Sequence, residues 1–197
     1  MNVYTPAHFE VADREELLAF MRHYNFATLV SVHDGKATAT HVPLVVQEDD
    51  NRVSLLGHVA KANEHWKSLA TGAEVLAIFT GPHGYVSPSL YESKLTVPTW
   101  NYTAVHAYGT AVIIDAEPAL RALVETAEPG YRKQFDELPP EFRAKMIDGV
   151  VAFEIRVDRL EGKFKLSQNR PIGDQLSVAA SFEGTELGEF MKERLRR

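Results

Sequence analysis

The sequence predicts a mainly β protein with flanking helices, folded as a small antiparallel barrel. Six segments have the composition or the alternation of strands, and most helical patterns lie toward the two ends of the chain. Asp34 and Gly35 separate two of these segments and favour a tight hairpin turn, because both residues tolerate positive φ angles. A barrel would also remove the unpaired edges that an open sheet leaves.

The first half of the chain predicts two helices and four strands. In "DREELLAFMRHY" (13–24) the apolar residues share one helical face, and Asp13 is placed to cap the helix. Strands are expected at "FATLVSV" (26–32), "ATATHVPLVV" (37–46), "RVSLLGHVA" (52–60) and "AEVLAIFTG" (73–81), with a short helix at "NEHWKSLA" (63–70). Pro43 has no N–H to donate, so its strand must be an edge, a bulge or a break there.

The second half begins with "GPHGYVSPSLYESKLTVP" (81–98), whose Gly, Pro and Ser content predicts a long ordered loop. The segment 99–115 then alternates as a long strand, with Asn101, Thr103, Val105, Ala107 and Gly109 on one face and Trp100, Tyr102, Ala104, His106 and Tyr108 on the other. Residues 117–128, 139–147 and 185–197 predict helices, and 149–167 a final long strand or bent pair. We expect one domain over residues 1–197, helical at its N-terminus and in its C-terminal third.

Composition excludes several functions. The chain of 197 residues has no Cys, which rules out disulfides, thiolate metal sites and a Cys nucleophile. Its net charge of -6 offers no general attraction to nucleic acid, and the C-terminal "KERLRR" is typical of a solvated helix end. No apolar run is long enough for a membrane span, and the N-terminal segment "MNVYTPAHFEVADREE" is too acidic for a signal peptide, so we expect a cytoplasmic protein.

A phosphate group could bind where residues 52–60 lead into the short helix. Lys61 supplies a positive charge there, and the amides at the Asn63 helix start would supply donors; the alternative is a solvated Lys beside a capped helix. His41, His58 and His65 either converge near this point or are separate half-exposed residues. No HExxH motif or similar ligand spacing predicts a metal site. "KLSQNRP" (165–171) suits an anion or a heterocycle edge, or is an ordinary exposed turn.

Four blocks, in this order, carry a resemblance to a known family: "GHVAKANEHW", "GPHGYVSPSLY", "VPTWNYTAVHAYG" and "KLSQNRP". Together they resemble the PaiB family of FMN-binding negative transcriptional regulators. That family is similar in fold to the FMN-binding split barrels, which include pyridoxamine phosphate oxidase. The resemblance therefore implies an antiparallel split β-barrel and a homodimer that binds FMN in two equivalent clefts at the subunit interface.

The resemblance also implies a set of cofactor-binding residues. Thr40, His41 and Val42 would run along the isoalloxazine; His58, Ala60, Lys61 and Asn63 would face the phosphate; Trp100 and Asn101 would approach from the second subunit; and Gln168 and Arg170 would close the cleft. The oxidase relatives have a fuller basic cluster at the phosphate, whereas Lys61 here stands between two alanines. We therefore expect weak FMN binding.

Two functions follow from the resemblance. One is a regulator that senses FMN and represses transcription, either on DNA directly or through a DNA-binding partner. The acidic charge and the missing DNA-reading helix argue against direct contact. The other is a flavin-dependent oxidoreductase or flavin reductase acting on a small molecule, in which FMN carries out the chemistry. A third, weaker possibility is that haem replaces FMN, with a His as ligand.

Overall fold

The structure is a computed structural model that describes residues 4–49 and 52–196. Residues 1–3, at the start of the N-terminal segment "MNVYTPAHFEVADREE", and residue 197, at the end of "KERLRR", lie outside this range. The strands are β1 (Glu10–Val11), β2 (Phe26–His33), β3 (Lys36–Pro43), β4 (Val45–Asp49), β5 (Arg52–Ala60), β6 (Glu74–Val86), β7 (Thr99–Ile114) and β8 (Val150–Lys165). The helices are α1 (Arg14–His23), α2 (His65–Leu69), α3 (Ala116–Ala127), α4 (Arg132–Glu137), α5 (Pro140–Asp148), α6 (Ile172–Ser181) and α7 (Glu186–Arg196), with 3-10 turns η1 (Ala7–Phe9), η2 (Pro88–Leu90) and η3 (Pro129–Tyr131).

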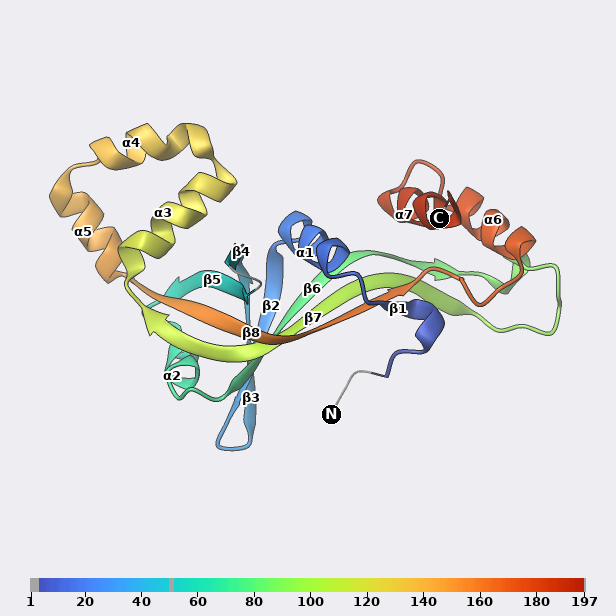
Figure 1. Cartoon of the computed structure of the whole chain (residues 1–197), viewed down its shortest axis with the longest axis horizontal. Coiled ribbons are helices and arrows are strands. Elements are labelled where there is room, and N and C mark those ends of the chain that lie inside the picture. Colours follow the sequence, from blue (N-terminus) through green and yellow to red (C-terminus); the bar gives the residue numbers. More distant parts are fainter. Residues whose placement is uncertain (1–3, 50–51, 197) are drawn as a thin grey trace. The chain divides into compact units, whose positions relative to one another are not determined.

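The described strands form one sheet in the order β3-β2-β6-β7-β8-β5-β4, and β1 pairs with β8 (Figure 1). The pairs β1–β8, β2–β3, β2–β6, β4–β5 and β5–β8 are all antiparallel, as predicted. The closed barrel is wrong: β3 and β4 lie at opposite ends of this path, and no register pairs them within 4–49 and 52–196. The expected strand 37–46 divides at Leu44, whose N–H donates to Asn25 O at 2.9 Å instead of to a neighbouring strand.

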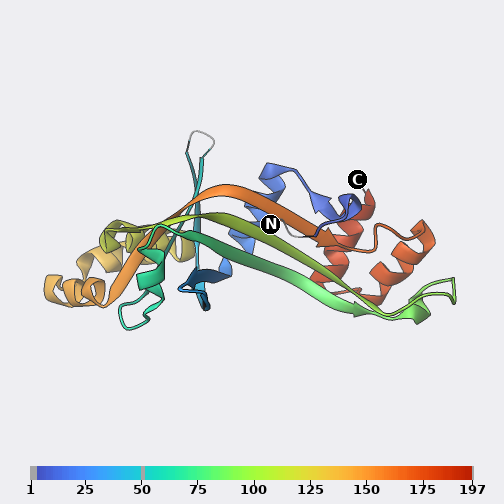
Figure 2. The ribbon, with the colours of Figure 1, turned by 90° about the horizontal axis from the view of Figure 1, so that it is seen from below.

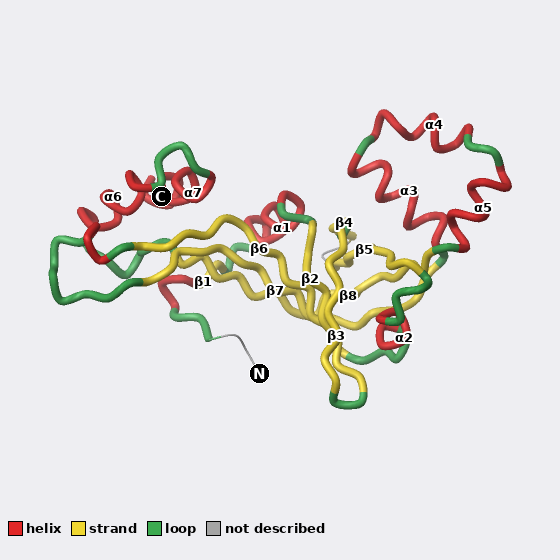
Figure 3. Tube along the Cα trace, turned by 180° about the vertical axis from the view of Figure 1, so that it is seen from behind, coloured by secondary structure: helices red, strands yellow, loops and turns green. Residues whose placement is uncertain are grey.

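The chain divides into two compact units. Unit 1 comprises Met1–Leu17, Thr80–Val105 and Glu161–Arg197, and unit 2 comprises Leu18–Phe79 and His106–Leu160. In unit 1, α6 and α7 lie on one face of the long strands (Figure 2). In unit 2, α3, α4 and α5 form a helical arm between the end of β7 and the start of β8 (Figure 3).

The predicted loop 81–98 is wrong in its first third, because β6 continues to Val86. Gly84 in this segment has a packing role rather than a turn role: a Cβ there would lie 2.5 Å from the Phe182 ring and 2.9 Å from Leu187. Pro82 also lies within β6, and its carbonyl accepts a hydrogen bond from Thr103 Oγ1 at 3.2 Å. The helix α6 and the short helix α4 were not predicted.

Several local predictions are confirmed. Asp34 and Gly35 have φ angles of 50° and 72°, as a tight hairpin turn between β2 and β3 requires. Asp13 Oδ1 accepts from the N–H groups of Glu15 and Glu16 at 2.9 and 3.2 Å, which caps α1. The long strand β7 alternates as expected, and Asn101 to Gly109 bury the odd-numbered face.

A buried histidine fastens α2 to the β2–β3 hairpin. His65 is only 3% exposed, and its two ring nitrogens lie 2.8 Å from Ser31 Oγ and 2.7 Å from Thr40 Oγ1. Asn63 Nδ2 also donates to Thr40 Oγ1 at 3.2 Å. Burial lowers the pKa of His65, so the ring is neutral and one nitrogen donates while the other accepts.

This histidine makes stability depend on pH. Because the folded-state pKa of His65 is lowered, the unfolded chain binds the proton more readily, and the free energy of unfolding falls as pH drops below about 6.5. His65→Gln should be less stable at neutral pH but lose less stability on acidification, as measured by urea unfolding between pH 7.5 and 5. His33→Gln, which changes an exposed histidine outside the network, should keep the parent slope.

Gly109 allows β7 to approach β8 closely. A Cβ at this position would lie 2.0 Å from Arg156 O, so Gly109→Ala must displace the backbone. We expect the free energy of unfolding to fall by about 1–3 kcal/mol, measured by urea denaturation. The matched control is Gly130→Ala, where no atom lies within 4 Å of the added Cβ and the change should stay within about 0.5 kcal/mol. Equal losses for both variants would contradict this account.

Candidate functional site

Lys61 lies at the surface, directly after the last residue of β5. Its Nζ donates to Asp148 Oδ1 at 2.8 Å, and the two side chains are 57% and 82% exposed. This hydrogen bond and the attraction to Lys61 hold the pKa of Asp148 below its usual value. An ion pair so exposed to water contributes little to stability, so the Lys61 cation can exchange Asp148 for another anion at small cost.

Three of the backbone donors beside Lys61 are already used. The N–H groups of Asn63, His65 and Trp66 donate to Ala60 O, Asn63 Oδ1 and Asn63 O. Asn63 thus closes the helix start through its side chain and its carbonyl, and these three amides already have partners within the turn. The helix α2 has only five residues, and its start is closed by its own turn. Lys61 is therefore an exposed cation at this point, and Asp148 is its partner.

The three histidines near this point have separate surroundings. His65 lies between Ser31 and Thr40, as described above. His41 is exposed, and its ring stacks toward that of Phe26, with 6.4 Å between centroids and 27° between planes. Of its neighbours on β3, Val42 points into the core and Thr40 is half-buried. Exposed Ala60, the last residue of β5, presents only a methyl group.

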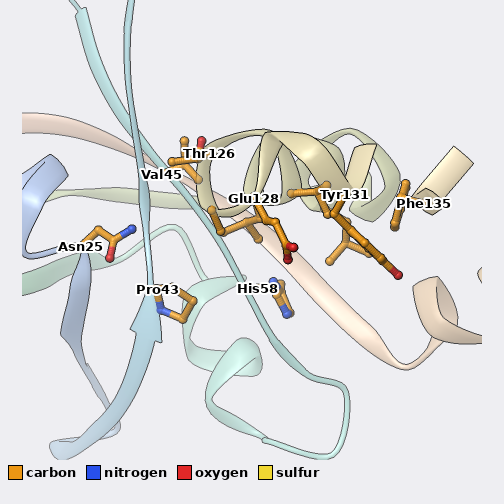
Figure 4. A pocket seen from close by; sticks show the side chains of 12 residues that line it. Asn25, Pro43, Val45, His58, Thr126, Glu128, Tyr131 and Phe135 are labelled. Atoms are coloured by element: carbon orange, nitrogen blue, oxygen red, sulfur yellow. The ribbon is translucent and has the colours of Figure 1, made fainter. Parts of the chain in front are cut away.

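His58 lines a pocket of about 320 Å³ in unit 2 (Figure 4). Its walls come from β3, β4 and β5 on one side and from α3, η3 and α4 on the other. The lining residues are Asn25, Pro43, Val45, His58, Leu120, Leu123, Val124, Thr126, Ala127, Glu128, Tyr131 and Phe135. The pocket is therefore mainly apolar, with a few polar groups among its walls.

The His58 ring has an unsatisfied buried atom. Its Nδ1 is buried and has no hydrogen-bond partner within residues 4–49 and 52–196, and burial lowers the pKa of the ring. His58 is therefore neutral near pH 7 and presents one donor and one acceptor. Since buried polar atoms are nearly always paired in folded proteins, a ligand is one way to complete this one.

The other predicted site residues lie in unit 1. Asn101 is fully buried, and its amide exchanges hydrogen bonds with Ser167 Oγ at 3.0 and 3.2 Å. The Gln168 amide closes its own turn through Phe164 O and the Leu166 N–H, both at 2.6 Å. Both amides thus bind partners inside this unit. A ligand would have to contact the other two predicted residues, Trp100 and Arg170.

Those two residues present an aromatic and a cationic surface. Trp100 is 54% exposed, and its ring centroid lies 6.1 Å from that of Tyr85. The Arg170 guanidinium lies 4.3 Å from the centroid of the Tyr91 ring and donates to Thr96 Oγ1 at 3.1 Å. A planar ring or an anion could be met by this pair of side chains.

Lys165 also lies in unit 1, and the sequence did not single it out. Its Nζ donates to Thr99 Oγ1 and, at 2.6 Å, to Trp100 O. Burial, followed by the nearby charges of Lys163 and Arg170, lowers the pKa of Lys165. The "KLSQNRP" block contains this residue, but nothing local in the sequence reveals that Lys165 reaches back to the start of β7.

The described part of the chain contains neither a metal-binding cluster nor a membrane-spanning helix. No group of three His, Asp or Glu side chains there is arranged to hold a metal ion. Within residues 4–49 and 52–196, every helix is also too short or too polar to cross a membrane.

Comparisons with known proteins agree with this picture. A family model described as "Putative FMN-binding domain" matches residues 3–159. The "Protease synthase and sporulation protein PAI 2" of Bacillus subtilis is 34% identical over 99% of each chain. An uncharacterized Aspergillus fumigatus protein is 29% identical, with 76% of this chain and 78% of the relative covered.

Two solved structures share the fold at 19% identity. An FAD and haem binding protein from Mycobacterium smegmatis has a TM-score of 0.65 over 85% of this chain and 78% of its own. A flavocytochrome from Azotobacter vinelandii has a TM-score of 0.62 over 79% and 69%. From the family match and the full-length similarity to the Bacillus relative, the chain belongs to the FMN-binding family of PaiB, as the four sequence blocks predicted.

Proposed function

We propose that the chain is an FMN-binding negative transcriptional regulator of the PaiB type, with FMN in a cleft between two copies. FMN is the cofactor that the family match supports. The observation that carries the proposal is the similarity to the Bacillus protein, whose name places it in protease synthesis and sporulation, over 99% of both chains. The homodimer and the repressor role rest on the resemblance to the family.

The residues of unit 2 fit a flavin nucleotide. Lys61 provides an exposed cation whose present partner is itself exposed, which suits a phosphate monoester. The exposed rings of Phe26 and His41 provide aromatic surface on the neighbouring hairpin. In this proposal Thr40, His41 and Val42 border the ring system, while Ala60, Lys61 and Asn63 border the phosphate. The resemblance also implied His58 at the phosphate, but its ring lines the apolar pocket of Figure 4 instead.

The residues of unit 1 would complete the cleft from the second copy. Trp100 offers an exposed ring and Arg170 a cation, whereas Asn101 and Gln168 would act through the backbone that their side chains hold in place. Lys165 joins this group, because its ammonium fixes the carbonyl of Trp100. A monomeric protein with bound FMN would contradict the shared cleft.

The alternative is a flavin-dependent oxidoreductase or flavin reductase. FMN, when bound, supplies the hydride and electron transfer that protein side chains do not. The fold neighbours named as a flavocytochrome and as an FAD and haem binding protein keep this alternative and the haem alternative open. In this case the chain would bind and orient the cofactor and a small substrate, without a side chain yet assigned to proton transfer.

Lys61→Ala should weaken FMN far more than riboflavin, because only FMN carries the phosphate. A hydrogen bond to a charged group contributes about 1.5–3 kcal/mol, so the dissociation constant for FMN should rise tenfold or more. Flavin fluorescence titration of the full chain measures both ligands. Asp148→Asn is the matched control: it breaks the same ion pair but keeps the cation, so FMN should bind at least as tightly as to the parent. Equal losses for FMN and riboflavin would show that Lys61 does not hold the phosphate.

The two functions differ in what FMN-loaded protein does. As a regulator acting through a partner, it should neither shift its upstream DNA at low salt nor oxidise NADH or NADPH, because the chain carries a net charge of -6 and no assigned catalytic group. A gel shift tests DNA binding. The absorbance of the reduced nicotinamide, at about 340 nm, tests the oxidation of NADH and NADPH once about one equivalent of cofactor or more has been added. A salt-sensitive shift would show direct repression, and sustained turnover would establish the oxidoreductase.

A further inference from the structure

The pocket beside His58 has walls suited to a small organic molecule. Leu120, Leu123 and Val124 on α3 and the rings of Tyr131 and Phe135 are only half-buried, and all five line this space. Its volume of about 320 Å³ lies within the range of small-molecule sites. These walls would gain apolar contact from a ligand that excludes water.

One charge in the pocket lacks a counterion. Of the described residues that line it, Glu128 is the only carboxylate, and it has no ion-pair partner there. The neighbouring acids of the helical arm are paired: Asp136 and Glu117 with Arg121, and Glu125 with Arg132. Arg121 and Arg132 are thus already matched to other carboxylates, and the exposed Glu128 carboxylate adds a negative charge to the pocket.

The end of α3 adds to this negative charge. Ala127 is the last residue of α3, Glu128 follows it, and the last turn contains no basic residue. The carbonyl groups at a helix C-terminus carry partial negative charge, which a cation stabilises and an anion does not. A phosphate would therefore be repelled here, so the pocket does not suit the negative end of FMN.

His58 supplies a hydrogen-bonding group on the opposite wall. Its buried Nδ1 has no hydrogen-bond partner among the described residues, and Figure 4 shows its ring and the Glu128 carboxylate on facing sides of the same pocket. A ligand with N–H groups could meet both. The aromatic rings of Tyr131 and Phe135 would also favour a positive charge.

We propose that this pocket binds a small, largely apolar organic cation that carries one amine or amidine group. The charged group pairs with Glu128 at the end of α3, and the apolar body packs against Leu123 and Phe135. This site is separate from the proposed flavin cleft, since it selects the opposite charge. It would give the protein a second ligand besides FMN.

Benzamidine, benzamide and benzoate test the proposal, because they share one shape and differ in charge. Titration of the full chain, followed by calorimetry and by amide chemical shifts of residues 120–135, should show benzamidine binding at least tenfold tighter than benzamide, with benzoate weakest. Benzamidine should bind equally well with and without saturating FMN. Equal binding of the three compounds, or competition between benzamidine and FMN, would overturn the proposal.

Glu128→Gln should abolish the preference for benzamidine over benzamide while leaving benzamide binding unchanged. Glu141→Gln, which removes an exposed acid outside the pocket, is the matched control and should keep the preference. Leu123→Trp should block all three compounds by filling the pocket. Circular dichroism shows whether each variant is folded, and a folded Glu128→Gln protein that still prefers benzamidine would refute the role of Glu128.

Discussion

The arrangement of unit 2 depends on the buried imidazole of His65. It joins a helix of five residues to two strands through Ser31 and Thr40, and so short a helix has little stability of its own. Lys61 lies in the turn that precedes this helix, and His41 lies on the hairpin to which the helix is fastened. The same contact therefore fixes both the cation and the exposed rings of the proposed flavin site. Protonation of His65 would remove an acceptor that one of the two hydroxyl groups needs.

Local predictions from the sequence succeeded where one short segment determines the structure. The hairpin turn needs only Asp34 and Gly35, the first helix only Asp13 and its apolar face, and β7 only its alternation. The prediction of a loop at Pro82 and Gly84 was wrong, because a glycine that makes room for Phe182 looks the same in sequence as a glycine in a turn. The closed barrel failed because it depended on pairing between distant strands, which no local pattern encodes.

The candidate site follows the same division. The sequence placed a cation after β5, and Lys61 is exposed there. It did not reveal Asp148, which is 87 residues away and reaches Lys61 only through the helical arm. The resemblance to the family named Asn101 and Gln168, but their amides satisfy partners inside unit 1. It missed Lys165, whose contact with Trp100 spans 65 residues. The type of a residue suggests that it binds something, but the tertiary structure decides which group it contacts.

The proposed flavin site offers one exposed cation to the phosphate, and this bears on the choice between the two functions. An enzyme that keeps a resident flavin needs several groups on its phosphate, whereas here one exposed lysine must exchange a carboxylate for it. Such an exchange must first give up the contact with Asp148, and the N–H groups of Asn63, His65 and Trp66 are already bound within their own turn. Occupancy would then follow the FMN concentration rather than stay saturated. A site whose occupancy changes with ligand concentration suits a sensor, because only a change in occupancy can shift the equilibrium between two states of the protein.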